Sequence, residues 1–151
     1  MKRKNKIGII VLLIVATTYS AFHERQGFSA EKAANYATAN AESKSRNMCA
    51  LYIACALNAG GQPVPLLRGC DYKWYFDLFL HNQFKGISVE QYNPQIGDIV
   101  VFPKVPGHPY GHIAMWNGEQ WVSDFKQRNI IVSKAYDINS CSLYRPQTIV
   151  R

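Results

Sequence analysis

The pattern of apolar and polar positions divides the chain into segments of different character. Residues 7–16 are an uninterrupted apolar run behind four cations, and residues 22–28 are largely polar. From residue 29 to residue 84 the apolar positions follow a helical period, whereas the apolar segments after residue 97 are short and rich in β-branched and aromatic residues. Helices followed by an antiparallel sheet predict an α+β domain.

Three helices are predicted in the first half. An Ala-rich helix over 29–41 begins at Ser29, a good N-cap, and a second over 47–59 stops at Gly60 and Gly61. The second has almost no polar face, so we expect it to be buried on nearly all sides. The third covers 71–84 and ends at Gly86. Its expected apolar stripe is Trp74, Tyr75, Leu78 and Phe79.

Five short segments of the second half are predicted to be strands. They are residues 98–102, 112–116, 120–125, 130–133 and 142–145. Asn117 and Gly118 form a strong hairpin signal between two of them. The chain shows no internal repeat.

The N-terminal segment has the layout of an export signal, with a basic start before its apolar run. The run is interrupted at Thr17 and Thr18, short of the ~20 apolar residues that span a bilayer. We therefore favour a cleaved signal over 1–21, with an uncleaved membrane anchor as the alternative. Residues 22–28 are a linker and 29–151 one domain, located in the periplasm, outside the cell, or at the inner membrane if the anchor is retained.

Export would allow disulfides among the four cysteines. If one cysteine is a catalytic thiol, at most one bridge can form, and we expect it between Cys70 and Cys141. The net charge of +7 includes four cations of the signal, so the mature domain is only mildly basic. This charge fits either attraction to an anionic cell wall or ordinary surface solvation. No basic run is interleaved with aromatic residues, so we expect no nucleic-acid partner.

Cys49 is the candidate nucleophile. It lies in the first turn of the second predicted helix, near unpaired backbone N–H groups and the positive end of the dipole, which favour thiolate over thiol. A cysteine nucleophile needs an imidazole that later protonates the leaving amine. His112, at the start of a predicted strand, can face a helix start from the end of a sheet. A buried structural thiol is the simpler alternative for Cys49, and Cys55 is expected to be core or disulfide.

The predicted hairpin supplies a third residue. Depending on the turn type, Ser123, Asp124 or Phe125 comes level with His112, and a plain two-residue turn would select Ser123. Asp124 is the one able to orient an imidazole, so we assign it that role. His108 and His112 with Cys49 could also be metal ligands, but the prolines and glycines of 106–111 forbid the helix that would align the two histidines. We expect no metal and no cofactor.

Three segments carry a resemblance to a known family. They are Asn47-Met48-Cys49-Ala50-Leu51-Tyr52, Pro94-Gln95-Ile96-Gly97-Asp98-Ile99-Val100-Val101-Phe102, and Gly111-His112-Ile113-Ala114-Met115-Trp116. In order and spacing the chain resembles the papain-like cell-wall peptidases of the CHAP and NlpC type, which include peptidoglycan amidases. Residues 121–127 also look like part of the amidase effectors delivered between competing bacteria.

The resemblance implies a papain-like fold in which the helix cysteine attacks, the Gly-His pair supplies the base, and a polar residue of the next strand orients it. Asp124, twelve residues after His112, matches the NlpC position, although His, Asn, Gln or Glu is commoner there. The implied partner is the stem peptide of peptidoglycan, and a cognate immunity or inhibitor protein is a further candidate. The expected substrate-binding residues are Asn47, Tyr52, His108 and Tyr110.

The expected function is therefore that of an exported peptidoglycan hydrolase. Cys49 and His112 would cleave an amide bond of the stem peptide through a thioester. A different class remains open, an exported disulfide-stabilised binding or inhibitor protein with an inactive papain-like fold. Acyl transfer to an amine by the same thiol is a third option.

Overall fold

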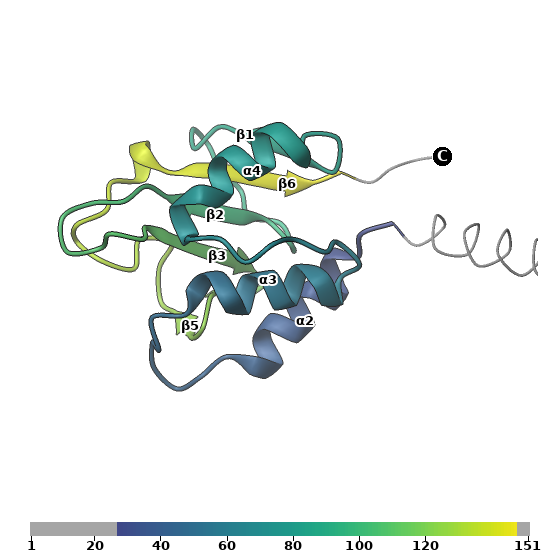
Figure 1. Cartoon of the computed structure of the whole chain (residues 1–151), viewed down its shortest axis with the longest axis horizontal. Coiled ribbons are helices and arrows are strands. Elements are labelled where there is room, and N and C mark those ends of the chain that lie inside the picture. Colours follow the sequence, from purple (N-terminus) through teal and green to yellow (C-terminus); the bar gives the residue numbers. More distant parts are fainter. Residues whose placement is uncertain (1–26, 148–151) are drawn as a thin grey trace, which may run out of the picture.

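The computed structural model describes residues 27–147, which form an α+β domain as predicted (Figure 1). The helices are α2 (Ala30–Asn40), α3 (Cys49–Ala59) and α4 (Tyr72–Phe79), with 3-10 turns η1 (Gly69–Asp71) and η2 (Ile138–Ser140). The strands are β1 (Phe84–Ile87), β2 (Ile99–Phe102), β3 (His112–Trp116), β4 (Trp121–Val122), β5 (Lys126–Gln127) and β6 (Ser142–Pro146). The α+β class predicted from the sequence is thus confirmed.

The six strands form one antiparallel sheet in the order β1-β6-β2-β3-β4-β5. One apolar cluster joins residues of α2, α3 and α4 to alternate residues of β2 and β3, among them Ile99, Val101, Ile113 and Met115. A second cluster on the other face includes Val100, Phe102, Ala114 and Tyr136. The sheet therefore separates a helical layer, seen with α3 beside β3 in Figure 1, from a layer of loops.

The first two helices begin and end close to the predicted residues. The Ser29 hydroxyl accepts the Lys32 N–H at 3.2 Å, which confirms Ser29 as the N-cap of α2. The Gly60 N–H caps α3 by donating to the Ala56 carbonyl at 3.0 Å. α3 packs between α2 and β3, but Leu51 is 39% exposed, so the helix is less enclosed than predicted.

The third helix differs from the prediction in length and in the face it buries. α4 ends at Phe79, and Phe84, the last residue of the predicted helix, instead begins β1 beside β6. The buried positions are Tyr72, Phe76 and Leu80. The predicted stripe faces outward: Trp74, Leu78 and Phe79 are exposed, and Tyr75 is half-buried. Phe76 stacks on Tyr144 of β6 at 4.7 Å, and this contact sets the orientation of the helix.

The hairpin predicted at Asn117 and Gly118 is formed, with four residues between the strands because Trp116 pairs with Trp121. The side-chain oxygen of Asn117 accepts the Glu119 and Gln120 N–H groups and holds the turn. The strand predicted over 120–125 stops at Val122, and the chain turns back into β5. No strand forms over 130–133.

All four cysteines are free, so the predicted bridge between Cys70 and Cys141 is not formed. Cys70 belongs to η1 and packs against Gly111. Cys141 packs against the second apolar cluster, on the other face of the sheet. Within residues 27–147 no helix is both long and apolar enough to cross a membrane. The predicted signal, residues 1–21, lies outside the described residues.

Candidate active site

Cys49 begins α3 at the end of a loop, residues 41–48, that crosses from α2. Asn47, near the end of this loop, lies in the left-handed region at φ 58°, which asparagine tolerates better than most residues. The backbone N–H groups of Ile113, Ala50 and Cys49 itself lower the pKa of the Cys49 thiol. The sulfur therefore lies between the first turn of α3 and the start of β3.

His112 is the first residue of β3, opposite Phe102 of β2. The preceding Gly111 has φ +64°, and a Cβ at this position would come within 2.7 Å of the Cys70 Cβ. Because η1 packs so closely here, and its Cys70 N–H donates to the Tyr110 carbonyl at 2.9 Å, only glycine fits before His112. η1 thus holds the strand start that carries the imidazole.

Cys49 and His112 line one cleft with a volume of about 600 Å³. The third predicted catalytic residue, Asp124, lines it too, as do the predicted substrate-binding residues Asn47, His108 and Tyr110. The other lining residues are Ser45, Gly107, Pro109, Gly111, Phe125, Val132, Ser133 and Tyr136. Tyr52 is not among them, because its hydroxyl donates to Glu42 at 2.9 Å.

The side chain that contacts the imidazole is Gln127 of β5. Its amide nitrogen is 2.6 Å from Nε2 of His112 and 2.9 Å from the Ser123 hydroxyl. Gln127 is buried, and its Oε1 has no hydrogen-bond partner among the described residues. Gln127 was not predicted as a site residue from the sequence, although glutamine is among the commoner residues for the orienting role.

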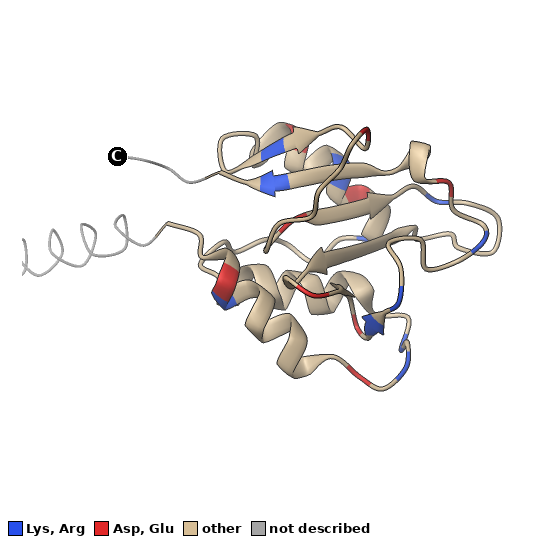
Figure 2. Cartoon of the chain, turned by 180° about the vertical axis from the view of Figure 1, so that it is seen from behind, with Lys and Arg blue, Asp and Glu red and all other residues tan. Residues whose placement is uncertain are grey.

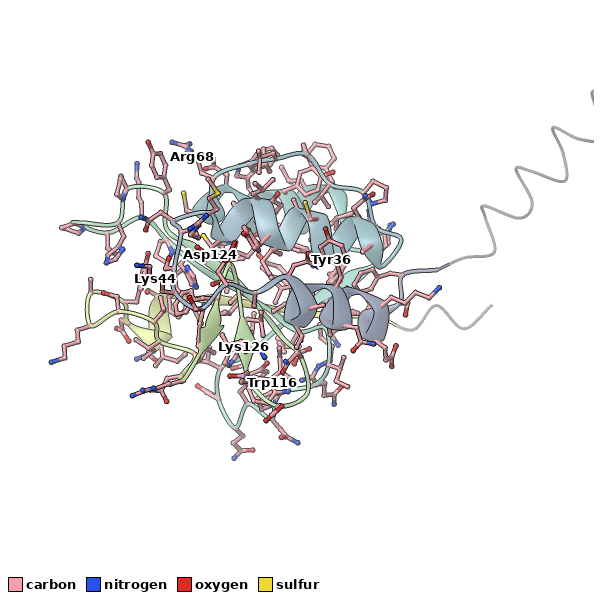
Figure 3. The ribbon with its side chains drawn as sticks, turned by 90° about the horizontal axis from the view of Figure 1, so that it is seen from below. Tyr36, Lys44, Arg68, Trp116, Asp124 and Lys126 are labelled. Carbon is pink, nitrogen blue, oxygen red and sulfur yellow. The ribbon has the colours of Figure 1, made fainter. Side chains whose placement is uncertain are left out.

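Asp124 holds the loop that precedes the nucleophile. One of its carboxylate oxygens accepts the N–H groups of Arg46 at 2.5 Å and Met48 at 3.2 Å, and the Ser45 hydroxyl at 3.2 Å. Its backbone carbonyl accepts the Glu42 N–H at 2.8 Å. Figure 3 shows Asp124 near the first turn of α3. Its other carboxylate oxygen accepts the Ser123 hydroxyl at 3.0 Å. No hydrogen bond among the described residues joins Asp124 to His112, so its predicted role beside His112 stays a prediction.

The Cys49 thiol and the His112 imidazole both favour their uncharged forms. Burial raises the pKa of Cys49, and the three N–H groups, which lower it, offset this only in part. The predicted stabilisation of the thiolate by the helix start is therefore present but smaller than the cost of burial. Burial also lowers the pKa of His112 to about 4, against the opposing effects of the Asp124 charge and of Gln127.

Tyr136 is a cleft residue that was not predicted from the sequence. Its ring lies 5.1 Å from that of His108 and 6.4 Å from that of His112, between centroids. The side chain is 5% exposed, and its hydroxyl has no partner among the described residues. Burial raises its pKa to about 12, so the hydroxyl remains a hydrogen-bond donor at neutral pH. No local sequence signal pointed to this residue.

Among residues 27–147 no group of three or more His, Cys, Asp or Glu side chains is placed to hold a metal ion. The family model of the CHAP domain matches residues 38–135, which include Cys49, His112 and Asp124. The chain belongs to the CHAP family. This confirms the resemblance drawn from the three sequence segments.

Two solved structures support the assignment of this CHAP domain. Both are crystal structures of the type VI effector–immunity complex Tae3–Tai3 from Ralstonia pickettii, one native and one with selenomethionine. The native one is 31% identical, with a TM-score of 0.69, over 80% of this chain and all of the matched chain. The other is 32% identical, with a TM-score of 0.64, over 75% and 98%. The papain-like fold is thereby confirmed. A search of curated proteins gave no match.

Proposed function

We propose that this CHAP domain is a cysteine amidase that hydrolyses an amide bond in the stem peptide of peptidoglycan. The observation that carries the proposal is the arrangement of Cys49 and His112 in one cleft, with Gln127 against the far nitrogen of the imidazole. Membership of the CHAP family and similarity to a type VI effector support the peptidoglycan substrate.

Because thiol and imidazole both favour their neutral forms, His112 acts as a general base. As the Cys49 sulfur attacks the amide carbon, its proton moves to Nδ1 of His112, and charge develops on the carbonyl oxygen. Backbone N–H groups at the start of α3 donate to that oxygen. His112 then gives the proton to the leaving amine. Water, activated by the same imidazole, hydrolyses the thioester and regenerates the thiol.

Gln127 orients the base in this mechanism. Its amide, turned by 180°, would present Oε1 to Nε2 of His112, where the oxygen accepts the ring N–H. This hydrogen bond fixes the tautomer whose Nδ1 is free to accept the thiol proton. The sequence assigned this role to Asp124; the contacts favour Gln127 for orientation and Asp124 for positioning Cys49 through the loop at 41–48.

The site of action in the proposal is the periplasm, where peptidoglycan is accessible. The predicted export signal at 1–21 favours secretion by the producing cell, whereas the similarity to Tae3 favours delivery by a type VI system. In either setting we propose a cognate immunity protein as partner, since the similar structures are effector–immunity complexes.

Digestion of purified sacculi tests the enzymatic proposal. Wild type should release muropeptides whose masses identify the cleaved bond, and Cys49→Ala should release none. Cys55→Ala, on the same helix, is the matched control and should retain activity. Product masses that show an added amine in place of water would support acyl transfer. Folded wild-type protein that releases nothing would leave the inactive binding protein as the better hypothesis, although the free Cys49 thiol favours the enzyme.

A further inference from the structure

A second groove adjoins the catalytic cleft and carries cations. It has a volume of about 470 Å³ and shares the lining residues Ser45, Phe125 and Val132 with the cleft, so the two are neighbours. Lys44, Lys126 and Arg128 line it, and no Asp or Glu does. We call it the cationic groove.

These cations are exposed and available to a ligand. The ion pairs of the described residues are Arg68–Asp71, Lys73–Asp77 and Arg145–Asp98, and none involves the groove. Figure 2 shows the blue strand β5 beside the blue positions of the loop after α2, and Figure 3 labels Lys44 and Lys126 near Asp124. A concentration of one sign of charge beside a reactive cleft attracts ligands of the opposite sign.

The two segments that carry the cations are fixed to one another. Glu42 and Phe125 form a parallel β-bridge, and the Asp124 carboxylate holds the backbone of Arg46 and Met48. The backbone segments that carry the lysine and arginine side chains are therefore already held in place before a ligand binds. Gln127 lines the same groove and contacts His112, so one side chain separates the groove from the catalytic base.

We propose that the cationic groove is a subsite for a free carboxylate of the substrate peptide. Peptides that contain diaminopimelate or a free C-terminus carry such a group next to their amide bonds, and ammonium and guanidinium groups bind it through charge-assisted hydrogen bonds. The inference rests on the proposed function for the identity of the peptide. Such a subsite makes the enzyme selective for stem peptides with free carboxylates over stem peptides whose carboxylates are amidated.

The binding experiment uses full-length Cys49→Ala protein and two synthetic stem peptides with diaminopimelate, one with free carboxylates and one with every carboxylate amidated. At low salt the peptide with free carboxylates should bind roughly 5- to 30-fold more tightly than the amidated peptide, as two or three partly exposed charge contacts would give. Added salt should reduce this difference in affinity. Lys126→Gln/Arg128→Gln in the same background should abolish the preference. Lys32→Gln/Lys85→Gln, which removes the same charge from exposed positions outside the groove, should keep it.

Equal affinity for the two peptides, no binding of either, or a preference that survives Lys126→Gln/Arg128→Gln would overturn the inference. A hydrolysis assay with the Cys49-containing protein distinguishes failure of the subsite from failure of the proposed amidase function. Cleavage of both peptides at equal kcat/KM would leave the amidase in place and remove the subsite. Carboxylate-selective binding without any hydrolysis would keep the subsite and reject the amidase.

Discussion

The amide of Gln127 lies 2.6 Å from Nε2 of His112, although the two residues are fifteen positions apart and on strands that do not pair with each other. β4, between them, is only two residues long, and the tight turn after it returns the chain so that Gln127 pairs with Trp121. Both side chains are buried, so the contact is shielded from water. A buried contact of this kind can fix the ring of a catalytic histidine.

Removing the Gln127 amide should therefore slow the chemical step. We expect Gln127→Ala to lower kcat by about 10- to 100-fold with little change in KM, because the imidazole loses its orientation and tautomer. Gln127→Glu should restore part of kcat and move the acidic limb of the pH–rate profile upward, since a carboxylate raises the pKa of His112. Gln95→Ala, at an exposed glutamine, is the control. A kcat unchanged by Gln127→Ala would contradict the orienting role.

Asp124 should contribute to stability as well as to activity. Asp124→Asn weakens the hydrogen bonds from Arg46, Met48 and Ser45, and we expect unfolding free energy to fall by about 1–3 kcal/mol. The loss should be the same in a Cys49→Ala background, where no catalysis occurs. Urea unfolding measures it. Wild-type stability with a lower kcat would instead support the role beside His112 that the sequence predicts.

The pH dependence of stability should report the buried imidazole. The pKa of His112 is lowered to about 4 from an unfolded value near 6.5, so the unfolded chain binds the proton first. This contribution is complete above pH 6.5 and is lost as the pH falls toward 4, by up to about 3 kcal/mol. Between pH 7 and 4.5, His112→Asn should lose less stability than wild type, and the exposed control His81→Asn should follow wild type. Parallel curves for wild type and His112→Asn would refute this assignment.

Local signals predicted the framework of the site well. Ser29 and Gly60 bound their helices, and the Gly-His pair starts β3 at the predicted residue. These features depend on capping and on backbone conformation within a few residues. The orientation of α4 could not be predicted in the same way, because apolar side chains surround the helix and Tyr144, a distant residue, selects the buried face.

The catalytic pair was predictable for the same reason, but its surroundings were not. Cys49 and His112 follow from a helix start and a strand start, whereas Gln127 reaches the ring only because the chain reverses at Ser123 and Asp124. Tyr136 enters the cleft from a loop with no regular period. The net pKa of Cys49 depends on burial, which is a property of the packed molecule.

The hydroxyl of Tyr136 provides a test of stability, because it is buried and has no hydrogen-bond partner among the described residues. A buried hydroxyl without a partner costs free energy, so Tyr136→Phe should raise the unfolding free energy by about 1 kcal/mol. Tyr136 lines the catalytic cleft, but its hydroxyl is buried away from it, so KM should stay unchanged.

Tyr92→Phe is the matched comparison for this prediction. Its hydroxyl donates to the buried carboxylate of Asp98 at 2.8 Å, outside the cleft. Removing it leaves a buried charge with one donor fewer, so stability should fall by about 1–2 kcal/mol while KM stays unchanged. Thermal unfolding and steady-state kinetics on one stem peptide give both quantities. If Tyr136→Phe lowers stability as Tyr92→Phe does, the Tyr136 hydroxyl has a hydrogen-bond partner in the folded protein and the prediction is wrong.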